Sequence, residues 1–157
     1  MDSRLMRAWE LLAGVMDPEI PALSVVDLGM IREVYLAGDI LVVELMPTFA
    51  GCPAVGMMQV DIAERLAALA PLHVVIVRYE PWTSARITAA GREKLRAAGF
   101  APPPRGDLLQ LTVISAAACP YCGSTETRME SPFGPTACRA IHYCRACRQP
   151  FEQFKAV

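Results

Sequence analysis

Hydrophobic residues recur at the helical period in two stretches of the first seventy residues. In residues 3–15 the apolar positions lie three to four residues apart, and Ser3 is placed to cap the start. A clearer apolar stripe runs through residues 55–69, and Pro53 is suited to the first turn of a helix there. We therefore predict two amphipathic helices, each with one buried face.

Three other stretches have the short apolar runs of β-strands. Residues 28–35 and 40–46 flank an Ala-Gly-Asp turn at 37–39, a pattern that indicates a hairpin. The second of these strands is apolar on both faces, so we expect it to be central and covered on both sides. Residues 73–79 form a third strand with the run Val-Val-Ile-Val.

A last helix is expected over residues 89–98, capped by Thr88 and ended by Gly99. The predicted order is helix, strand, strand, helix, strand, helix. Three consecutive prolines follow at residues 102–104 and form a stiff extended spacer. Beyond them, residues 108–114 are expected to form a short strand.

The end of the last helix and the three prolines divide the chain into three parts. We expect an α/β domain over residues 1–101, a proline-rich linker over 102–107 and a cysteine module over 108–157. The net charge is −1, and 20% of the residues are charged. Such a balance favours neither nucleic acid nor an anionic membrane as partner, and no apolar run is long enough to span a bilayer. The N-terminus lacks the pattern of a signal peptide, so we expect a cytoplasmic protein.

Five of the six cysteines lie between residues 119 and 147, which points to a metal rather than to disulfides. Cys119 and Cys122 form one CxxC knuckle, and Cys144 and Cys147 form a second. Two knuckles supply the tetrahedral thiolate set of a structural zinc site, which has no open position for catalysis. The same ligands suit iron or an iron–sulfur cluster, and spacing alone does not separate these ions.

Two further residues lie inside the cysteine module. Cys138 is more simply a buried thiol than a ligand, because four better-spaced cysteines already complete the set. His142 could replace one of them, but a ring that faces the core or the solvent is the simpler interpretation.

Cys52 is the reactive candidate of the first domain. It lies just before the predicted helix, where the helix dipole would stabilise a thiolate. A small buried thiol beside a tight turn is an equally good interpretation of the residue by itself. Asp17 and Glu19 lie between prolines in a rigid loop, and by themselves they are typical of a solvated turn. The sequence contains no phosphate loop, dinucleotide fingerprint or Ser/His/Asp set.

Several motifs together resemble known families. DPEIP at residues 17–21, VDLGMI at 26–31 and TFAGCP at 48–53 resemble the SufT-like domain of iron–sulfur protein maturation. The stretches PWT at 81–83, GREKL at 91–95, SPFGPTAC at 131–138 and FEQFK at 151–155 resemble the D subunits of phenylacetyl-CoA epoxidase systems. The resemblance covers nearly the whole chain and both modules.

The resemblance implies an α+β fold of the iron–sulfur-assembly type with a C-terminal zinc-ribbon-like module. It implies an accessory maturation factor, not an enzyme, whose client is the reductase or the di-iron oxygenase subunit of the epoxidase. By this resemblance Cys52 is the reactive cysteine, Asp17 and Glu19 form the acidic loop, and the Thr-Ala-Cys motif gives Cys138 more weight than a buried thiol.

In the leading hypothesis Cys52 is a transient ligand for iron or an iron–sulfur cluster. One thiolate holds a cluster poorly, so a second protomer or the client must supply further ligands, which predicts a homodimer or a labile complex with the client. The alternative is a structural adaptor subunit in which Cys52 only packs. The hypothesis of a thiol-dependent enzyme is weak, because no residue can be named as the general base that would activate the thiol.

Overall fold

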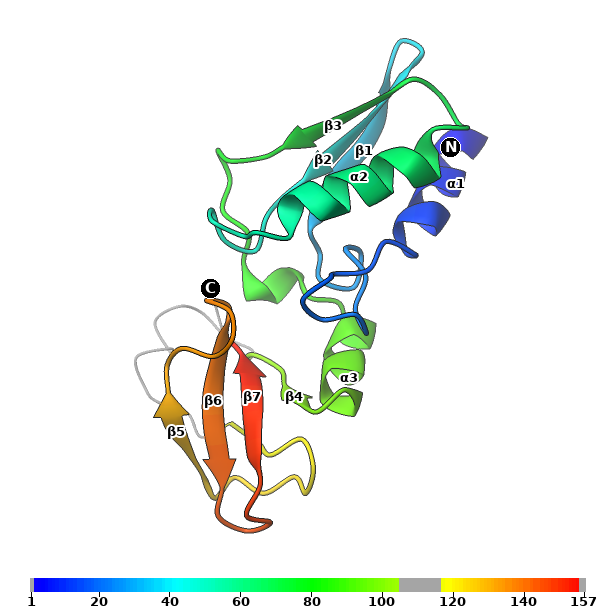
Figure 1. Ribbon diagram of the computed structural model, residues 1–157. Helices are drawn as coiled ribbons and strands as arrows, with labels where there is room; N and C mark the ends of the chain where they lie inside the picture. Colours follow the sequence, from blue (N-terminus) through cyan, green and yellow to red (C-terminus); the bar gives the residue numbers. More distant parts are fainter. Residues whose placement is uncertain (1, 105–116, 156–157) are drawn as a thin grey trace. The chain divides into compact units, whose positions relative to one another are not determined.

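The chain divides into two compact units in a computed structural model that describes residues 2–104 and 117–155 (Figure 1). The first unit comprises Met1–Trp82 and Arg86–Gly91, and the second comprises Thr83–Ala85 and Arg92–Val157. The expected domain boundary at residue 101 therefore falls inside the second unit. The strand expected at residues 108–114 lies outside the described residues, as does the end of the linker.

The order of elements through residue 97 is the predicted one. The helices are α1 (Ser3–Leu12), α2 (Val55–Leu66) and α3 (Ala89–Ala97), with a 3₁₀ turn, η1 (Ser84–Arg86), before α3. The strands of the first unit are β1 (Ile31–Ala37), β2 (Ile40–Leu45) and β3 (Leu72–Ile76). The predicted hairpin is confirmed: β1 and β2 pair antiparallel around Gly38, whose φ is +64°.

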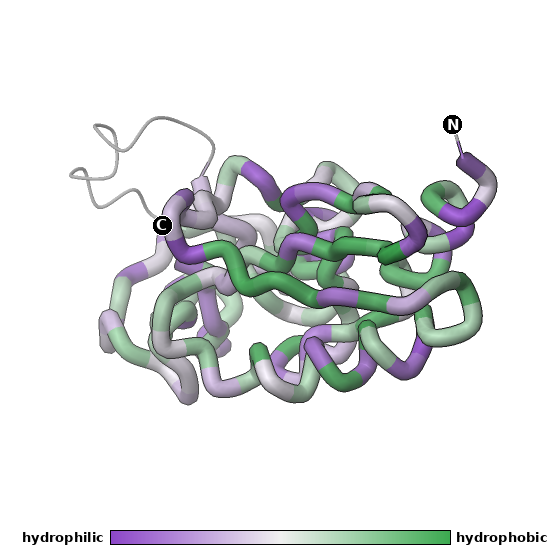
Figure 2. The backbone as a smooth tube through the Cα atoms, turned by 90° about the horizontal axis from the view of Figure 1, so that it is seen from above, coloured by the Kyte–Doolittle hydropathy of each residue, from purple (hydrophilic) through white to green (hydrophobic). Residues whose placement is uncertain are grey.

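The sheet of the first unit has the order β1-β2-β3, so β2 is central as predicted. Leu41, Val43 and Leu45 on one face of β2 are completely buried, and Val42 on the other face is nearly so. Ile40 at the start of the strand is 45% exposed, so the cover on the second face is incomplete. Hydrophobic and hydrophilic stretches can be followed along the tube in Figure 2.

Strands β2 and β3 run parallel, and α2 is the crossover between them. The helix buries Met58, Ile62 and Leu66 and packs on β3 and α1. This β-α-β arrangement places the loop between β2 and α2 at the carboxyl end of the parallel strands, which is where open α/β sheets commonly bind ligands.

Several predicted boundaries differ from the structure. The first strand begins at Ile31 rather than at residue 28, and the third ends at Ile76 rather than at residue 79. Asp2 caps α1 instead of Ser3, because its carboxylate accepts the backbone N–H of Arg4 at 2.8 Å. That helix also ends at Leu12 rather than at residue 15. Helix α2 begins at Val55, not at Pro53, since Pro53 and Ala54 lie in a turn in which the Val55 N–H points to the Cys52 carbonyl at 3.5 Å.

The segment after β3 is fastened to the loop that leads into β1. The indole N–H of Trp82 donates to the Leu28 carbonyl at 2.9 Å, and Arg86 donates to the carbonyls of Gly29 and Ile31. The backbone N–H of Thr88 donates to the Asp27 carbonyl at 2.9 Å. Donors of residues 82–88 thus satisfy backbone carbonyls of residues 27–31 and hold the two segments together.

Trp82→Phe should destabilise the first unit by about 2–3 kcal/mol. The indole is 3% exposed, so its loss leaves a small void and a buried carbonyl without its donor. Chemical denaturation measures the change, with Tyr79→Phe as the control because Tyr79 is 72% exposed in the same segment. Equal midpoints for the two variants would show that the Trp82 bond contributes nothing.

The second unit contains a four-stranded sheet of order β4-β7-β6-β5. Its strands are β4 (Phe100–Ala101), β5 (Thr127–Ser131), β6 (Arg139–Cys144) and β7 (Pro150–Phe154). Thr88 caps α3 through the N–H of Gly91, and Gly99 ends it with φ +86°, both as predicted. Buried Arg92 donates to the carbonyls of Pro103 at 2.6 Å and Ser84 at 3.0 Å, which holds the prolines within this unit.

Candidate functional site: a four-cysteine metal centre and the Cys52 loop

The four predicted zinc ligands meet in the second unit. The sulfur atoms of Cys119, Cys122, Cys144 and Cys147 all lie within 4.8 Å of one another. The Sγ–Sγ distance is 3.7 Å from Cys119 to Cys147 and 3.6 Å from Cys122 to Cys144. Zn–S bonds of about 2.3 Å in a tetrahedron place the sulfurs roughly 3.8 Å apart, so this set fits zinc.

Two turns position the sulfurs. In the first knuckle the N–H of Gly123 donates to the Cys119 carbonyl at 2.9 Å, and Gly123 has φ +75°. That left-handed conformation favours glycine, as the sequence indicated. In the second, Cys144 ends β6 and the turn returns into β7, with the Cys144 N–H bonded to the Gln149 carbonyl at 2.9 Å.

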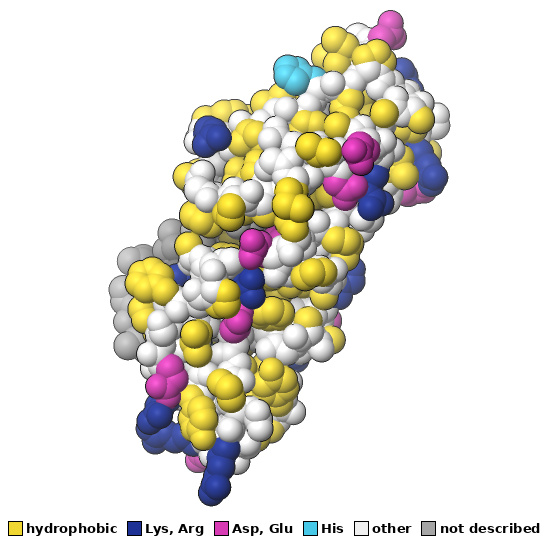
Figure 3. Space-filling view, viewed as in Figure 1, with side chains coloured by type: hydrophobic (Ala, Val, Ile, Leu, Met, Phe, Trp, Pro, Cys, Tyr) yellow, Lys and Arg dark blue, Asp and Glu magenta, His cyan; other side chains and the backbone are white. Residues whose placement is uncertain are grey.

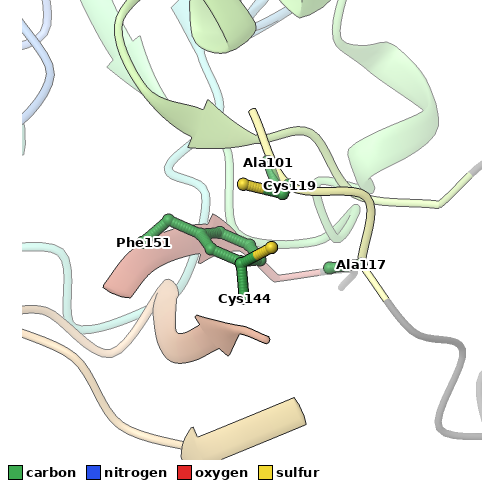
Figure 4. Packing of buried hydrophobic residues seen from close by; sticks show 5 residues of the cluster. All are labelled: Ala101, Ala117, Cys119, Cys144 and Phe151. Carbon is green, nitrogen blue, oxygen red and sulfur yellow. The ribbon is translucent and has the colours of Figure 1, made fainter. Parts of the chain in front are cut away.

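The sulfurs lie against a small apolar core. Figure 4 shows Cys119 and Cys144 beside the ring of Phe151, with Ala101 and Ala117 completing the cluster. All five side chains are buried, and Cys147 packs against them. A core of this size holds little free energy of folding, so the metal is needed to stabilise it.

The thiols of the set do not ionise alike. The pKa of Cys144 is lowered to about 7, chiefly because the backbone N–H of Cys147 donates to it. Burial, with the neighbouring thiols adding to it, raises the pKa of Cys147 to about 12. A dication at the centre would let all four lose their protons together, which is the charge state that thiolate coordination requires. Such a closed set has a structural role.

His142 and Cys138 lie outside this ligand set. His142 is 2% exposed and stacks on Phe151, with the ring centroids 5.4 Å apart, so it faces the core. Burial lowers its pKa, and neither ring nitrogen has a hydrogen-bond partner in the described structure. Cys138 is half-buried with its sulfur 3.1 Å from the Thr136 hydroxyl oxygen.

Cys52 lies in the turn between β2 and α2. Its side chain is half-buried, and the N–H of Val55, the first residue of α2, points to its carbonyl at 3.5 Å. Because α2 begins three residues later, Cys52 precedes the first helical turn. The ring of Phe49 covers Gly51 closely, since a Cβ at that glycine would lie 3.2 Å from the ring.

Asp17 and Glu19 lie in the proline-flanked loop, which a bridge between Met16 and Ser24 closes. One oxygen of the buried Asp17 carboxylate accepts the N–H groups of Glu19 at 2.6 Å and Ile20 at 3.2 Å. Asp17 therefore shapes the turn. Over residues 2–104 and 117–155, the four cysteines of the second unit are the only group of three or more His, Cys, Asp or Glu side chains that could hold a metal ion. Asp17, Glu19 and Cys52 therefore do not form a metal-binding group in this structure.

Comparisons with known proteins agree with both halves of the chain. Residues 7–78 match the family model of iron–sulfur cluster assembly proteins, and residues 106–155 match the PaaD zinc β-ribbon domain. No helix among the described residues is long and apolar enough to cross a membrane.

A curated relative covers almost the whole chain. The putative D subunit of the 1,2-phenylacetyl-CoA epoxidase of Escherichia coli (strain K12) is 38% identical over 151 residues, which is 95% of this chain and 91% of the relative. Among solved structures, a domain of unknown function (DUF59) from Bacillus anthracis matches 60% of this chain and 92% of its own with a TM-score of 0.55 at 23% identity, which supports the fold alone.

A solution structure of a Mycobacterium tuberculosis protein associated with iron–sulfur complex assembly and repair is 31% identical over 61% of this chain and 86% of its own, with a TM-score of 0.36. The Bacillus anthracis match, the zinc-ribbon match and the four clustered cysteines together give the fold: an α+β domain of the DUF59 type followed by a four-cysteine zinc-ribbon module. By its identity to the Escherichia coli protein and its two domain matches, the chain belongs to the PaaD family, the D subunits of phenylacetyl-CoA epoxidase systems.

Proposed function

We propose that this chain is an accessory maturation factor of a phenylacetyl-CoA epoxidase in aerobic phenylacetate degradation. It would assist assembly of the metal or iron–sulfur centre in the reductase or the di-iron oxygenase subunit, and would not itself catalyse epoxidation. The support is the combination of an epoxidase D-subunit relative with an iron–sulfur-assembly domain in one chain.

The position of Cys52 carries this proposal. Its loop follows β2 and leads into α2, at the carboxyl end of two parallel strands. A half-buried thiol in a turn can be reached by a partner that presses against the loop. It is the one cysteine of the chain in the first unit, whereas the other five follow residue 118.

Iron is cargo in this scheme. The Cys52 thiol releases its proton as the sulfur binds ferrous iron, and it regains a proton when the iron passes to the client. One thiolate leaves most positions of the iron open. By the resemblance Asp17 or Glu19 assists the thiolate, although the described residues do not bring these acids and Cys52 together as one metal-binding group. The remaining ligands would come from a second protomer or from the client.

Cys52→Ser should abolish maturation while leaving the fold intact. Serine keeps the size of the side chain but removes the soft thiolate that iron binds. The epoxidase subunits are produced in cells that lack this chain, the variants are supplied in turn, and the iron content and activity of each purified client are measured. The iron content of the client should fall to the level found without this chain.

Cys138→Ser is the matched control, because Cys138 is also half-buried and lies outside the zinc set. It should support normal maturation. Normal client iron with Cys52→Ser would remove the maturation role and leave an adaptor subunit in which Cys52 only packs. Loss of maturation with both serine variants would show a general defect rather than the loss of one ligand.

A further inference from the structure

The sheet of the second unit has one buried face and a second face that is partly open: Arg139 and its register partner Phe154 are buried at one end of this second face. Along β6, Ala140, His142 and Cys144 are at most 2% exposed; Cys144 is a metal ligand, and His142 stacks on Phe151 of the cluster beside it. Alternate residues of a strand point to opposite faces, so Ile141 and Tyr143 lie on the other side, where both are half-exposed. The zinc centre therefore stabilises a sheet whose second face remains accessible.

The register shows what gathers on that open face. Tyr143 is paired with Pro150 of β7 and with Arg128 of β5, while Glu152 of β7 is paired with both Ile141 and Phe100. We call this set the ribbon face; its members are Phe100, Arg128, Ile141, Tyr143, Pro150 and Glu152. All six side chains are at least partly exposed. Aromatic and aliphatic side chains of β4, β6 and β7 thus form an apolar strip on this face, with the charged Arg128 of β5 and Glu152 of β7 beside them.

A recess of about 290 Å³ lies within the strip. It is lined by Phe100, Ile141, Pro150 and Glu152 of the ribbon face and by Tyr121 of the first knuckle. Tyr121 is 59% exposed, with its ring against Gly99. A recess walled by aromatic side chains suits an apolar anchor from a protein partner.

Cationic side chains border the strip at the second knuckle. The Arg128 guanidinium lies over the Tyr143 ring, 5.5 Å from its centroid. Arg145 and Arg148 are exposed, and the N–H of Arg145 donates to the Glu126 carbonyl, which places this turn beside the start of β5. Figure 3 shows Lys and Arg side chains at the end of this unit where Figure 1 draws the β6–β7 turn.

The whole unit shares this sign of charge. It holds nine Lys and Arg against five Asp and Glu, a formal charge of +4, whereas the first unit holds six against eleven, a charge of −5. A zinc ion with four thiolates adds a charge of −2, so the formal charge of the second unit stays positive. The charge is not a continuous basic run, because Glu130 pairs with Arg128 at 2.5 Å and Glu152 with Arg139 at 2.7 Å.

We propose that the ribbon face is the docking surface for a protein partner that presents an apolar patch bordered by carboxylates. The proposal rests on the proposed function in one respect: the partner is the reductase or oxygenase subunit of the epoxidase. Tyr, Phe and Arg around an apolar recess are the composition of protein–protein hot spots. Nucleic acid would require unpaired cations along the phosphates, and Arg128, the one arginine of this face, is already paired with Glu130.

Binding of the zinc-loaded full chain to each purified epoxidase subunit tests the proposal. Arg145→Glu/Arg148→Glu should weaken binding about tenfold or more, since two carboxylates would then face those of the partner. Ile141→Glu should also abolish binding by placing a charge in the recess. Wild-type binding should weaken as salt is raised. Lys94→Glu/Arg96→Glu is the matched control, with the same change of charge on exposed residues of α3, and should bind like the wild type.

Zinc content and the denaturation midpoint confirm that each variant is folded. Equal binding by both double reversals, or no binding of the wild type to either subunit, would overturn the proposal. Binding of a single-stranded oligonucleotide instead would also overturn it and assign the face to nucleic acid. A large loss of stability in Ile141→Glu with normal binding by Arg145→Glu/Arg148→Glu would show that the strip is internal packing.

The maturation proposal and the docking proposal can be refuted by different results. Cys52→Ser should bind the client normally and fail only in maturation, whereas the ribbon-face variants should fail in binding. Loss of binding by the ribbon-face variants together with normal maturation by Cys52→Ser would keep the docking surface and remove the maturation chemistry.

Discussion

Removing the zinc, or replacing Cys144 by Ser, should unfold the zinc-ribbon module of the second unit. Structural zinc contributes about 10–16 kcal/mol to the folding of small zinc modules, which matches or exceeds the 5–15 kcal/mol stability of a typical domain. The core beside the sulfurs consists of two alanines, one phenylalanine and two cysteines that are themselves ligands. Without the ion, these residues cannot offset the entropy of ordering the chain.

Amide hydrogen exchange of residues 117–155 measures this result, together with zinc analysis by mass spectrometry. Chelation should remove one zinc per chain and the protection of these amides, while the amides of β2 stay protected because Leu41, Val43 and Leu45 form a core without metal. Cys138→Ser should keep its zinc. Full zinc in Cys144→Ser, or unchanged protection after chelation, would contradict the structural role of the ion.

Gly29→Ala should destabilise the first unit by about 3 kcal/mol or more. Two costs combine at this position. Gly29 has φ +63°, which costs an L residue about 1–2 kcal/mol. A Cβ would also overlap the carbonyl of Arg86, a backbone group that the bonds from Arg86 to Gly29 and Ile31 hold in place.

Gly38→Ala separates the two costs. Gly38 has nearly the same φ, +64°, but nothing lies within 4 Å of the position where its Cβ would be. Chemical denaturation should therefore show a loss of about 1–2 kcal/mol for Gly38→Ala, and a clearly larger loss for Gly29→Ala. Equal losses would mean that the loop before β1 can move away from the 3₁₀ turn at no cost.

The features that could be predicted from the sequence are those that depend on residues close together in the chain. The CxxC spacing identified all four zinc ligands, since two thiolates three residues apart in a tight turn need no distant information. The Ala-Gly-Asp turn similarly predicted the β1–β2 hairpin, and Thr88 and Gly99 predicted the ends of α3. Each of these features is decided by residues that are neighbours in the chain.

Contacts between distant segments could not be predicted in the same way. The parallel pairing of β4 with β7 joins residues about fifty positions apart and involves only two residues of β4, too few for a periodic pattern. The bonds from Trp82 and Arg86 to the loop before β1 have the same character. The ribbon face depends on the pairing of β4 with β7 and of β6 with β5 and β7, so it was visible only in the structure.

The Cys52 loop shows how a local rule can give the wrong boundary. Proline favours the first helical turn, so Pro53 predicted a helix start that would place Cys52 at the helix cap. The turn from Phe49 to Ala54 uses these residues instead, and α2 begins at Val55. The dipole of the helix is therefore weaker at Cys52 than we expected, because the effect falls off within a turn.

Metal analysis of anaerobically prepared protein tests the central claim, that Cys52 binds iron in transit to a client. Wild type and Cys52→Ser are compared before and after incubation with ferrous iron and sulfide. We predict one zinc per chain in both proteins, and additional iron in the wild type alone. Equal iron in the two proteins, or iron in neither, would contradict the claim and leave Cys52 as a packing residue of an adaptor subunit.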